Sequence, residues 1–138
     1  MSRPASESAS VGPAQLLRAA PYFLVRDPVA AAAHYTAVLG FQVEYTGGEP
    51  PEFVIVSRDG LPLMLKRAPR PDAIVPNEQQ AGTWDVFYWV RDVQTLHEEL
   101  ADRGATIVYG PTRQPYGVLE FAVRDQTGYV LGFGQAQG

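Results

Sequence analysis

Apolar and polar positions follow the same order in two stretches of the chain. In residues 20–40 a short apolar run leads into Val-Arg-Asp at 25–27, and a helix-type stretch then ends at a glycine. Residues 84–104 repeat this order, with Val-Arg-Asp at 90–92. An aspartate can accept hydrogen bonds from the first amides of a helix, and glycine readily adopts the left-handed conformation that ends one. Each stretch therefore predicts a strand followed by a capped helix.

Strand-type patterns follow the helix in both stretches. Residues 41–45 alternate apolar and polar side chains, and residues 52–67 contain two apolar runs around Arg-Asp-Gly, which is a hairpin signal. The same two patterns return after the second helix. The sequence thus predicts two tandem βαβββ units, 20–67 and 84–135, of an α+β fold. We expect a curved mixed sheet around a cup, with the helices on its outer face.

Length and composition are those of one globular domain. The chain has 138 residues, of which 46% are hydrophobic and 19% are charged. We expect a single domain over residues 19–135. Its two units are joined by a linker at 68–83, where three prolines and a glycine interrupt any periodicity. The Ser, Ala and Pro content of residues 1–18 predicts a disordered tail.

Charge and cysteine content exclude several classes of function. The net charge of −4 argues against a nucleic acid partner, because phosphates need a basic surface. The chain has no cysteine, which excludes disulfides and cysteine-bound zinc. No apolar run approaches the roughly 18 residues of a membrane span, and the N-terminus lacks the features of a signal peptide. We therefore expect a cytoplasmic protein with no membrane partner.

The order of motifs resembles the vicinal-oxygen-chelate superfamily, which includes glyoxalase I, bleomycin-resistance proteins, fosfomycin-resistance enzymes and extradiol dioxygenases. The resemblance covers about residues 19–135 and is closest to the metal-free bleomycin-resistance-like branch. It implies a homodimer, a frequent assembly in this family. The motifs that carry it are Val25-Arg26-Asp27, His34-Tyr35, Leu39-Gly40-Phe41, the run from Glu120 to Asp125, and Gly128-Tyr129.

The same resemblance assigns four positions to metal ligands in the metal-dependent members, one on each of four strands. Here these positions are Ala20, Met64, Asp85 and Gly132. Alanine and glycine have no ligating side chain, and a thioether is a poor ligand for a hard or borderline cation. We therefore expect no metal, no cofactor and no catalytic residue. A site made of carboxylates alone, from Asp85 and Glu120, stays open as an alternative.

The two histidines offer no replacement site. His34 lies on the apolar stripe of the first helix, which predicts a core histidine with a local hydrogen bond. His97 stands among Glu98 and Glu99, which is typical of a solvated helix face. Neither has a partner at the spacing of a metal site.

Strand alternation divides the side chains of a strand between two faces. In residues 84–90 it places Asp85, Phe87 and Trp89 on one side and the even-numbered residues, Trp84 included, on the other. The family resemblance implies that the first of these sets lines the cup. An apolar concave wall with few polar groups is typical of small-molecule sites. The predicted ligand-binding residues are Tyr22, Met64, Asp85, Phe87, Trp89, Tyr116 and Glu120.

Each of these assignments has a plainer alternative. The aromatic rings can fill the cup or a dimer interface, Tyr116 can belong to an ordinary surface turn, and Glu120 can pair with an arginine. Two main hypotheses follow. The first is a metal-free protein that sequesters an amphipathic, aromatic or cationic small molecule. The second is a divalent-metal lyase, isomerase or dioxygenase of the same superfamily. A third is a subunit whose repeated sheet serves only association.

Overall fold

The first unit forms a four-stranded mixed sheet with one helix. The computed structural model describes residues 12–137 of the chain. The strand order is β1-β4-β3-β2, with β1 parallel to β4 and the other pairs antiparallel. The elements of this unit are β1 (Tyr22–Val25), α1 (Pro28–Val38), β2 (Gln42–Gly47), β3 (Phe53–Arg58) and β4 (Leu61–Arg67).

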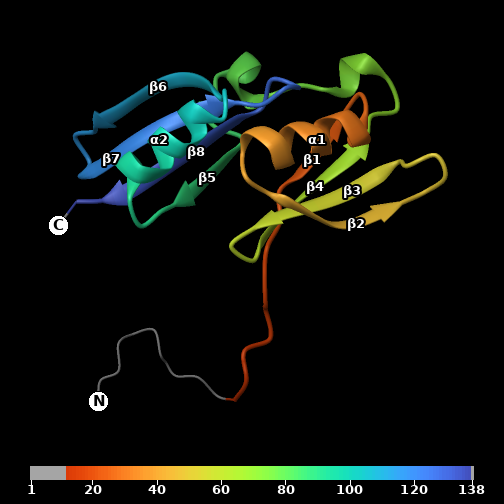
Figure 1. Cartoon of the computed structure of the whole chain (residues 1–138), viewed down its shortest axis with the longest axis horizontal. Helices are drawn as coiled ribbons and strands as arrows, with labels where there is room; N and C mark the ends of the chain where they lie inside the picture. The colour runs from red at the N-terminus through yellow and green to blue at the C-terminus, as the bar shows by residue number, and fades with distance from the viewer. Residues whose placement is uncertain (1–11, 138) are drawn as a thin grey trace.

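The second unit repeats this topology. Its strand order is β5-β8-β7-β6, again with one parallel pair, β5 with β8. The two tandem βαβββ units are therefore confirmed, as two separate sheets that lie side by side (Figure 1). The elements are β5 (Val86–Trp89), α2 (Val93–Asp102), β6 (Thr106–Arg113), β7 (Val118–Arg124) and β8 (Val130–Ala136).

Both helices begin and end as the sequence predicts. The Asp27 carboxylate accepts hydrogen bonds from the backbone amides of Val29 and Ala30 at the start of α1. Asp92 accepts from the amide of Thr95 at the start of α2. Gly40, just after α1, has a φ of +76°, a conformation in which a side chain would be strained. None of the helices formed by the described residues has the length and apolar character needed to cross a membrane.

The segment between the units carries short structure of its own. The predicted linker contains two 3₁₀ turns, η1 (Pro71–Ala73) and η2 (Asn77–Gln80). Arg124 in β7 holds the second turn through an ion pair with Glu78, at 2.8 Å. Of the predicted tail, residues 1–11 lie outside the described residues, and residues 12–18 form no helix or strand.

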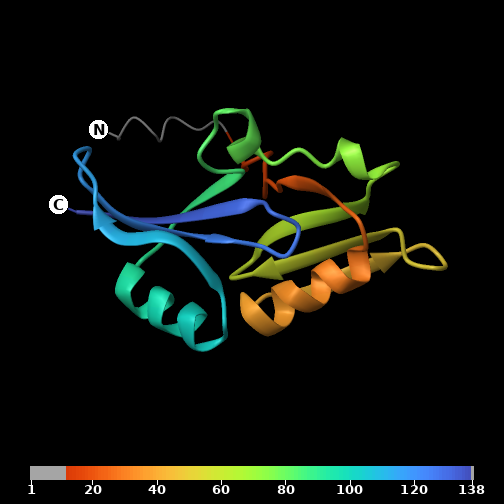
Figure 2. The ribbon, with the colours of Figure 1, turned by 90° about the horizontal axis from the view of Figure 1, so that it is seen from above.

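Each sheet has a helix face and an open face. Figure 2 shows α1 and α2 on the same side of the two sheets. Alternate residues of every central strand point to this helix face, where they form one core shared by both units. The buried apolar members from the strands include Phe23, Val25, Val54, Val56, Leu63, Leu65, Phe121, Val123, Leu131 and Phe133.

Two tyrosines, Tyr129 and Tyr35, join the units inside this core. The rings of Phe23 and Tyr129 stack with centroids 4.2 Å apart, and the Tyr129 hydroxyl donates to the backbone oxygen of Leu24. The buried Tyr35 hydroxyl on α1 donates to Asp125, which follows β7, at 2.6 Å. Because each contact spans the two units, the hydrophobic core is continuous between them.

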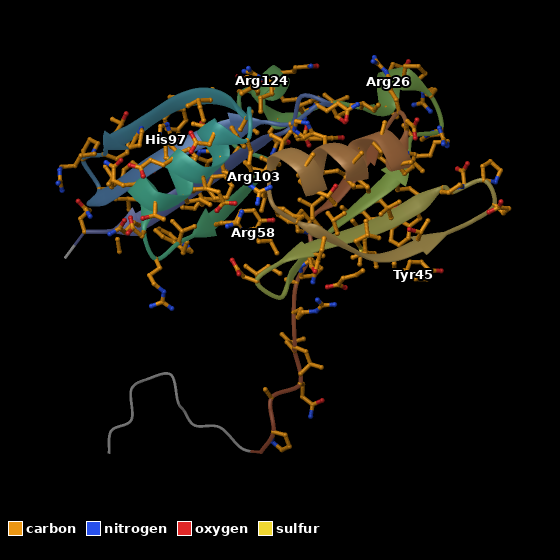
Figure 3. The ribbon with its side chains drawn as sticks, viewed as in Figure 1. Arg26, Tyr45, Arg58, His97, Arg103 and Arg124 are labelled. Carbon is orange, nitrogen blue, oxygen red and sulfur yellow. The ribbon has the colours of Figure 1, made fainter. Side chains whose placement is uncertain are left out.

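An ion-pair network joins the units at the surface. Arg58, at the end of β3, donates to both carboxylate oxygens of Glu99 on α2, at 2.9 and 2.7 Å. Arg103 donates to the same carboxylate. The two arginines lie close together between α1 and α2 (Figure 3). A bidentate arginine pair fixes orientation as well as distance, so this network holds α2 against the β3–β4 hairpin.

Candidate functional site

The predicted site residues divide between the two sheets. Tyr22 and Met64 lie on the open face of the first sheet, where they are direct neighbours on β1 and β4. Asp85, Phe87, Trp89 and Glu120 belong to the second sheet or its edge, and Tyr116 lies in the turn between β6 and β7. The residues of the second unit therefore include both carboxylates and most of the aromatic rings of the predicted site.

An aromatic surface covers the open face of the second sheet along β5. Phe87 and Trp89 contact each other edge to face, with ring centroids 5.0 Å apart. Tyr88 between them points to the core and stacks on Phe133, as strand alternation requires. Trp89 is 68% exposed, which leaves much of its ring available to a partner.

Two glycines of β8 make room for these rings. Gly132 pairs with Phe87 and Gly134 pairs with Trp89 across the parallel ladder. A Cβ atom on Gly132 would lie 2.7 Å from a ring carbon of Phe87. A larger residue at either position would push the aromatic rings away from the sheet.

Trp84 also lies on this open face, contrary to the alternation argument. Its indole contacts Gly132 and packs against Phe87 at a centroid distance of 4.6 Å. Strand β5 begins only at Val86, so the period of two does not extend back to Trp84. The Asn77 side chain instead holds the backbone oxygen of Trp84, at 2.9 Å.

Glu120 is the central polar residue of the second sheet. It is 1% exposed, and its two oxygens accept hydrogen bonds from the hydroxyls of Tyr109 and Tyr116, at 2.5 and 2.8 Å. The Trp84 indole in turn donates to the Tyr109 hydroxyl, at 2.8 Å. We refer to Trp84, Tyr109, Tyr116 and Glu120 as the Glu120 cluster. Its partners are phenols, so the alternative of an arginine partner for Glu120 does not hold among the described residues.

The two phenols remain protonated donors. Burial and the hydrogen bond to Glu120 raise the pKa of Tyr109 well above its ordinary value. Loss of solvent contact and the same carboxylate also raise the pKa of Tyr116. Deprotonating either one would place a second negative charge beside Glu120. The cluster therefore presents a carboxylate held by neutral hydroxyl groups.

Asp85 has a structural role in the described chain. One of its oxygens accepts from the backbone amide of Asn77 and the other from that of Val130, both at 2.8 Å. These bonds tie η2 to the start of β8. Both partners of Asp85 are backbone amides that hold the fold together, whereas one partner of Glu120 is the exposed Tyr116 side chain, so Asp85 is the weaker candidate for a ligand anchor.

The four family metal positions do not fit a metal ion. Ala20 and Gly132 offer no donor, Met64 offers only a thioether, and Asp85 is engaged with backbone amides. A side chain on Gly132 would also meet the indole of Trp84, with its Cβ 2.6 Å from Cδ1. Among residues 12–137, no group of three His, Asp or Glu residues is arranged to hold a metal ion.

Both histidines are half-buried and lie on the two helices, His34 on α1 and His97 on α2. His34 is half-buried, and its Nε2 has no hydrogen-bond partner, so the local bond expected from the sequence is missing at this atom. Burial lowers the pKa of His34. His97 was expected on a solvated face, but it is half-buried and meets Phe121 edge to face at 5.2 Å.

The open face of the first sheet is largely apolar. Four residues on it form a row across all four strands, since β1, β4, β3 and β2 pair in register. Tyr22 and Tyr45, at the two ends of this row, are 56% and 54% exposed. Tyr45 lies at the outer edge of the unit in Figure 3. The row consists of Tyr22, Met64, Ile55 and Tyr45.

A groove of about 540 Å³ lies between the two units. Its wall is mainly apolar, and its charged lining residues include Arg58 and Glu99. Of the predicted ligand-binding residues, only Trp89 lines this groove. It therefore remains a prediction that one ligand pocket is lined by Tyr22, Asp85, Phe87, Trp89 and Glu120.

The repeated units, with aromatic open faces and a buried carboxylate, define a class of small paired-βαβββ proteins. The chain belongs to the Glyoxalase/Bleomycin resistance protein/Dioxygenase superfamily, whose family model matches residues 16–133. None of the curated protein sequences compared with the chain matches it.

Solved structures of similar fold include ligand-binding proteins and an enzyme. TnmS3, an antibiotic binding protein from Streptomyces sp. CB03234, is 22% identical with a TM-score of 0.69 over 91% of this chain and 100% of its own. The bleomycin-binding protein from Streptomyces verticillus, complexed with copper(II)-bleomycin, is 24% identical with a TM-score of 0.62 over 91% and 98%. A lactoylglutathione lyase from Agrobacterium tumefaciens is 20% identical with a TM-score of 0.63 over 89% and 94%. At these identities the likeness establishes the fold.

Proposed function

We propose that the chain is a cytoplasmic, metal-free protein that sequesters an amphipathic small molecule of aromatic or cationic character. The observation that carries this proposal is the pairing of an exposed tryptophan, Trp89, with a buried carboxylate, Glu120, on one open sheet face. Both residues pair with Gly134 in the ladder, and the ring of Phe87 packs over this glycine, so Trp89, Phe87 and Glu120 follow one another on one face. A planar ligand can stack on the ring while a polar group reaches the carboxylate.

The metal-dependent alternative rests on the fold. The family includes dioxygenases, and the lactoylglutathione lyase shares the architecture. The chemistry of the four family positions supports the metal-free proposal instead. Elemental analysis of protein purified without chelators separates the two: stoichiometric nickel, zinc, manganese or iron would favour the enzyme.

We expect Trp89→Ala to weaken binding of a planar aromatic ligand at least fivefold. The lost stacking contributes about 1 kcal/mol beyond the area effect, and 1.4 kcal/mol corresponds to tenfold. Isothermal titration calorimetry with a panel of indole and quinoline compounds measures this directly.

A second variant distinguishes the open face from the groove. Leu96 on α2 lines the groove and packs against the core on the helix side of the sheet, whereas the Glu120 cluster belongs to the open face. Leu96→Ala should leave the affinity unchanged. An equal loss for Trp89→Ala and Leu96→Ala would move the site into the groove, and no saturable binding in the wild type would contradict the proposed function.

We also propose that a homodimer completes the site. Tyr22 and Tyr45 on the first sheet, and Trp89 and Tyr116 on the second unit, are each more than half exposed. Exposed aromatic groups of this kind are typical of surfaces that another chain or a ligand covers. Pairing of a first-sheet face with a second-sheet face of another copy would bring the seven predicted residues around one cup.

The oligomeric state tests this arrangement. Light scattering after gel filtration should give twice the 15.1 kDa mass of one chain. Tyr45→Asp should weaken association at least about tenfold, because a buried charge replaces an apolar contact. Val29→Asp, on the exposed side of α1, is the matched control. A monomer at micromolar concentration, or equal effects of both variants, would contradict the proposal.

A further inference from the structure

Glu120 is a buried carboxylate whose two hydrogen-bond donors are both uncharged. An ionised carboxylate has about four acceptor positions, and the described residues fill two of them, one from each phenol. No arginine, lysine or histidine of residues 12–137 forms an ion pair with it, although Arg58, Arg67 and Arg124 pair with other glutamates. A buried charge without a cation is costly to maintain.

The two phenols differ in position. Tyr109 is half-buried, lies on β6 and is itself held by the Trp84 indole. Tyr116 is 61% exposed and lies in the turn between β6 and β7, where Glu120 is its side-chain hydrogen-bond partner. Glu120 itself is 1% exposed, and Tyr116 is the more exposed of its two hydrogen-bond partners. Of the two donors, Tyr116 is the one that can leave without disturbing the sheet.

We propose that Tyr116 is a displaceable cap, and that the ligand replaces its hydroxyl with an N–H donor carried by a protonated primary or secondary amine. This inference rests on the proposed function and adds the chemical class of the polar group. The exchange conserves the acceptor count of Glu120, because one donor leaves as another arrives. The arriving donor also brings the missing positive charge, which makes the new hydrogen bond stronger than the one it replaces.

The need for an N–H group separates this subsite from cation–π binding alone. A quaternary ammonium carries the charge and can lie over an aromatic ring. It has no hydrogen to donate, so it cannot take the place of the Tyr116 hydroxyl on Glu120. The subsite should therefore prefer a protonated amine to its fully methylated analogue.

Three probes of nearly equal shape test this preference. They are tryptamine, N,N,N-trimethyltryptammonium and the neutral 3-propylindole, titrated by calorimetry at pH 7. We expect tryptamine to bind about tenfold or more tightly than either of the others. Glu120→Gln should abolish the difference and leave 3-propylindole nearly unchanged.

A matched pair of variants tests the cap itself. Tyr116→Phe removes the donor that the amine must displace, so tryptamine should bind about three- to tenfold more tightly. Tyr109→Phe removes a donor from the same carboxylate but opens no path to it, so it should bring no such gain. Neither variant should change the affinity for 3-propylindole as strongly as Tyr116→Phe changes the affinity for tryptamine.

The outcomes separate the two proposals. Saturable binding of 3-propylindole without a preference for tryptamine would overturn the amine subsite and keep the proposed function. Equal tightening by Tyr116→Phe and Tyr109→Phe would overturn the cap, because it would show a general effect on the carboxylate. Absence of saturable binding by all three probes would overturn both.

Discussion

Gly110→Ala should lower the free energy of unfolding by about 2–4 kcal/mol, through strain and overpacking together. Gly110 has a φ of +86° and lies in β6 against the neighbouring strand. A Cβ atom there would clash with the backbone oxygen of Glu120 and approach the Cα of Phe121 to 2.8 Å. Because these are backbone atoms, the strands must separate. Urea unfolding followed by circular dichroism measures the loss.

Gly104→Ala is the matched control for this substitution. Gly104 also has a positive φ, of +93°, but a Cβ atom on it would have no heavy atom within 4 Å. Gly104→Ala should lower the free energy of unfolding by about 1 kcal/mol, which is the contribution of backbone strain alone. The difference between the two variants isolates the contact between β6 and β7. Equal losses would show that this contact is not tight.

Gly110→Ala should also weaken ligand binding. Tyr109 precedes Gly110, and the ladder between β6 and β7 shifts register on both sides of Tyr109. This irregular geometry brings the Tyr109 hydroxyl to Glu120, so moving the strand apart breaks the Glu120 cluster. Calorimetry with tryptamine should show a larger loss of affinity for Gly110→Ala than for Gly104→Ala.

Asp125→Ala should destabilise the fold by about 3 kcal/mol or more, because it leaves buried donors unpaired. One oxygen of the buried Asp125 carboxylate accepts from three backbone amides after β7, each at 2.9 Å. The other accepts from Tyr35, which is 1% exposed and belongs to the other unit. The substitution therefore loosens both the β7–β8 turn and the junction of the units.

Two further variants define what Asp125 contributes. Asp125→Asn keeps an oxygen for the three amides and offers an N–H to the Tyr35 oxygen, so it should cost roughly half as much. Asp102→Ala, at an exposed position at the end of α2, should change stability by less than about 0.5 kcal/mol. Urea midpoints with unchanged m-values would give the three free energies. A loss for Asp125→Ala as small as that for Asp102→Ala would contradict the role of Asp125 as a junction.

The sequence by itself determined the repeat and most strand faces. Asp27 and Asp92 mark the helix starts because capping is a local interaction between a side chain and nearby amides. The alternation around Phe87 and Glu120 predicts their open faces correctly, since consecutive side chains of a strand point to opposite sides. These features depend on residues close together in the chain.

Only the tertiary structure decided what surrounds those residues. Tyr109 reaches Glu120 because the irregular register of β6 on β7 places it there, and no local pattern encodes that register. Trp84 joins the same face because the strand begins after it, and Asp85 is engaged by amides of a distant turn and strand. A period of two holds only inside a regular strand, and hydrogen bonds between distant segments depend on how the whole chain packs. The sequence therefore determined which faces are open, and the packing decided that Glu120 is buried there between two phenols.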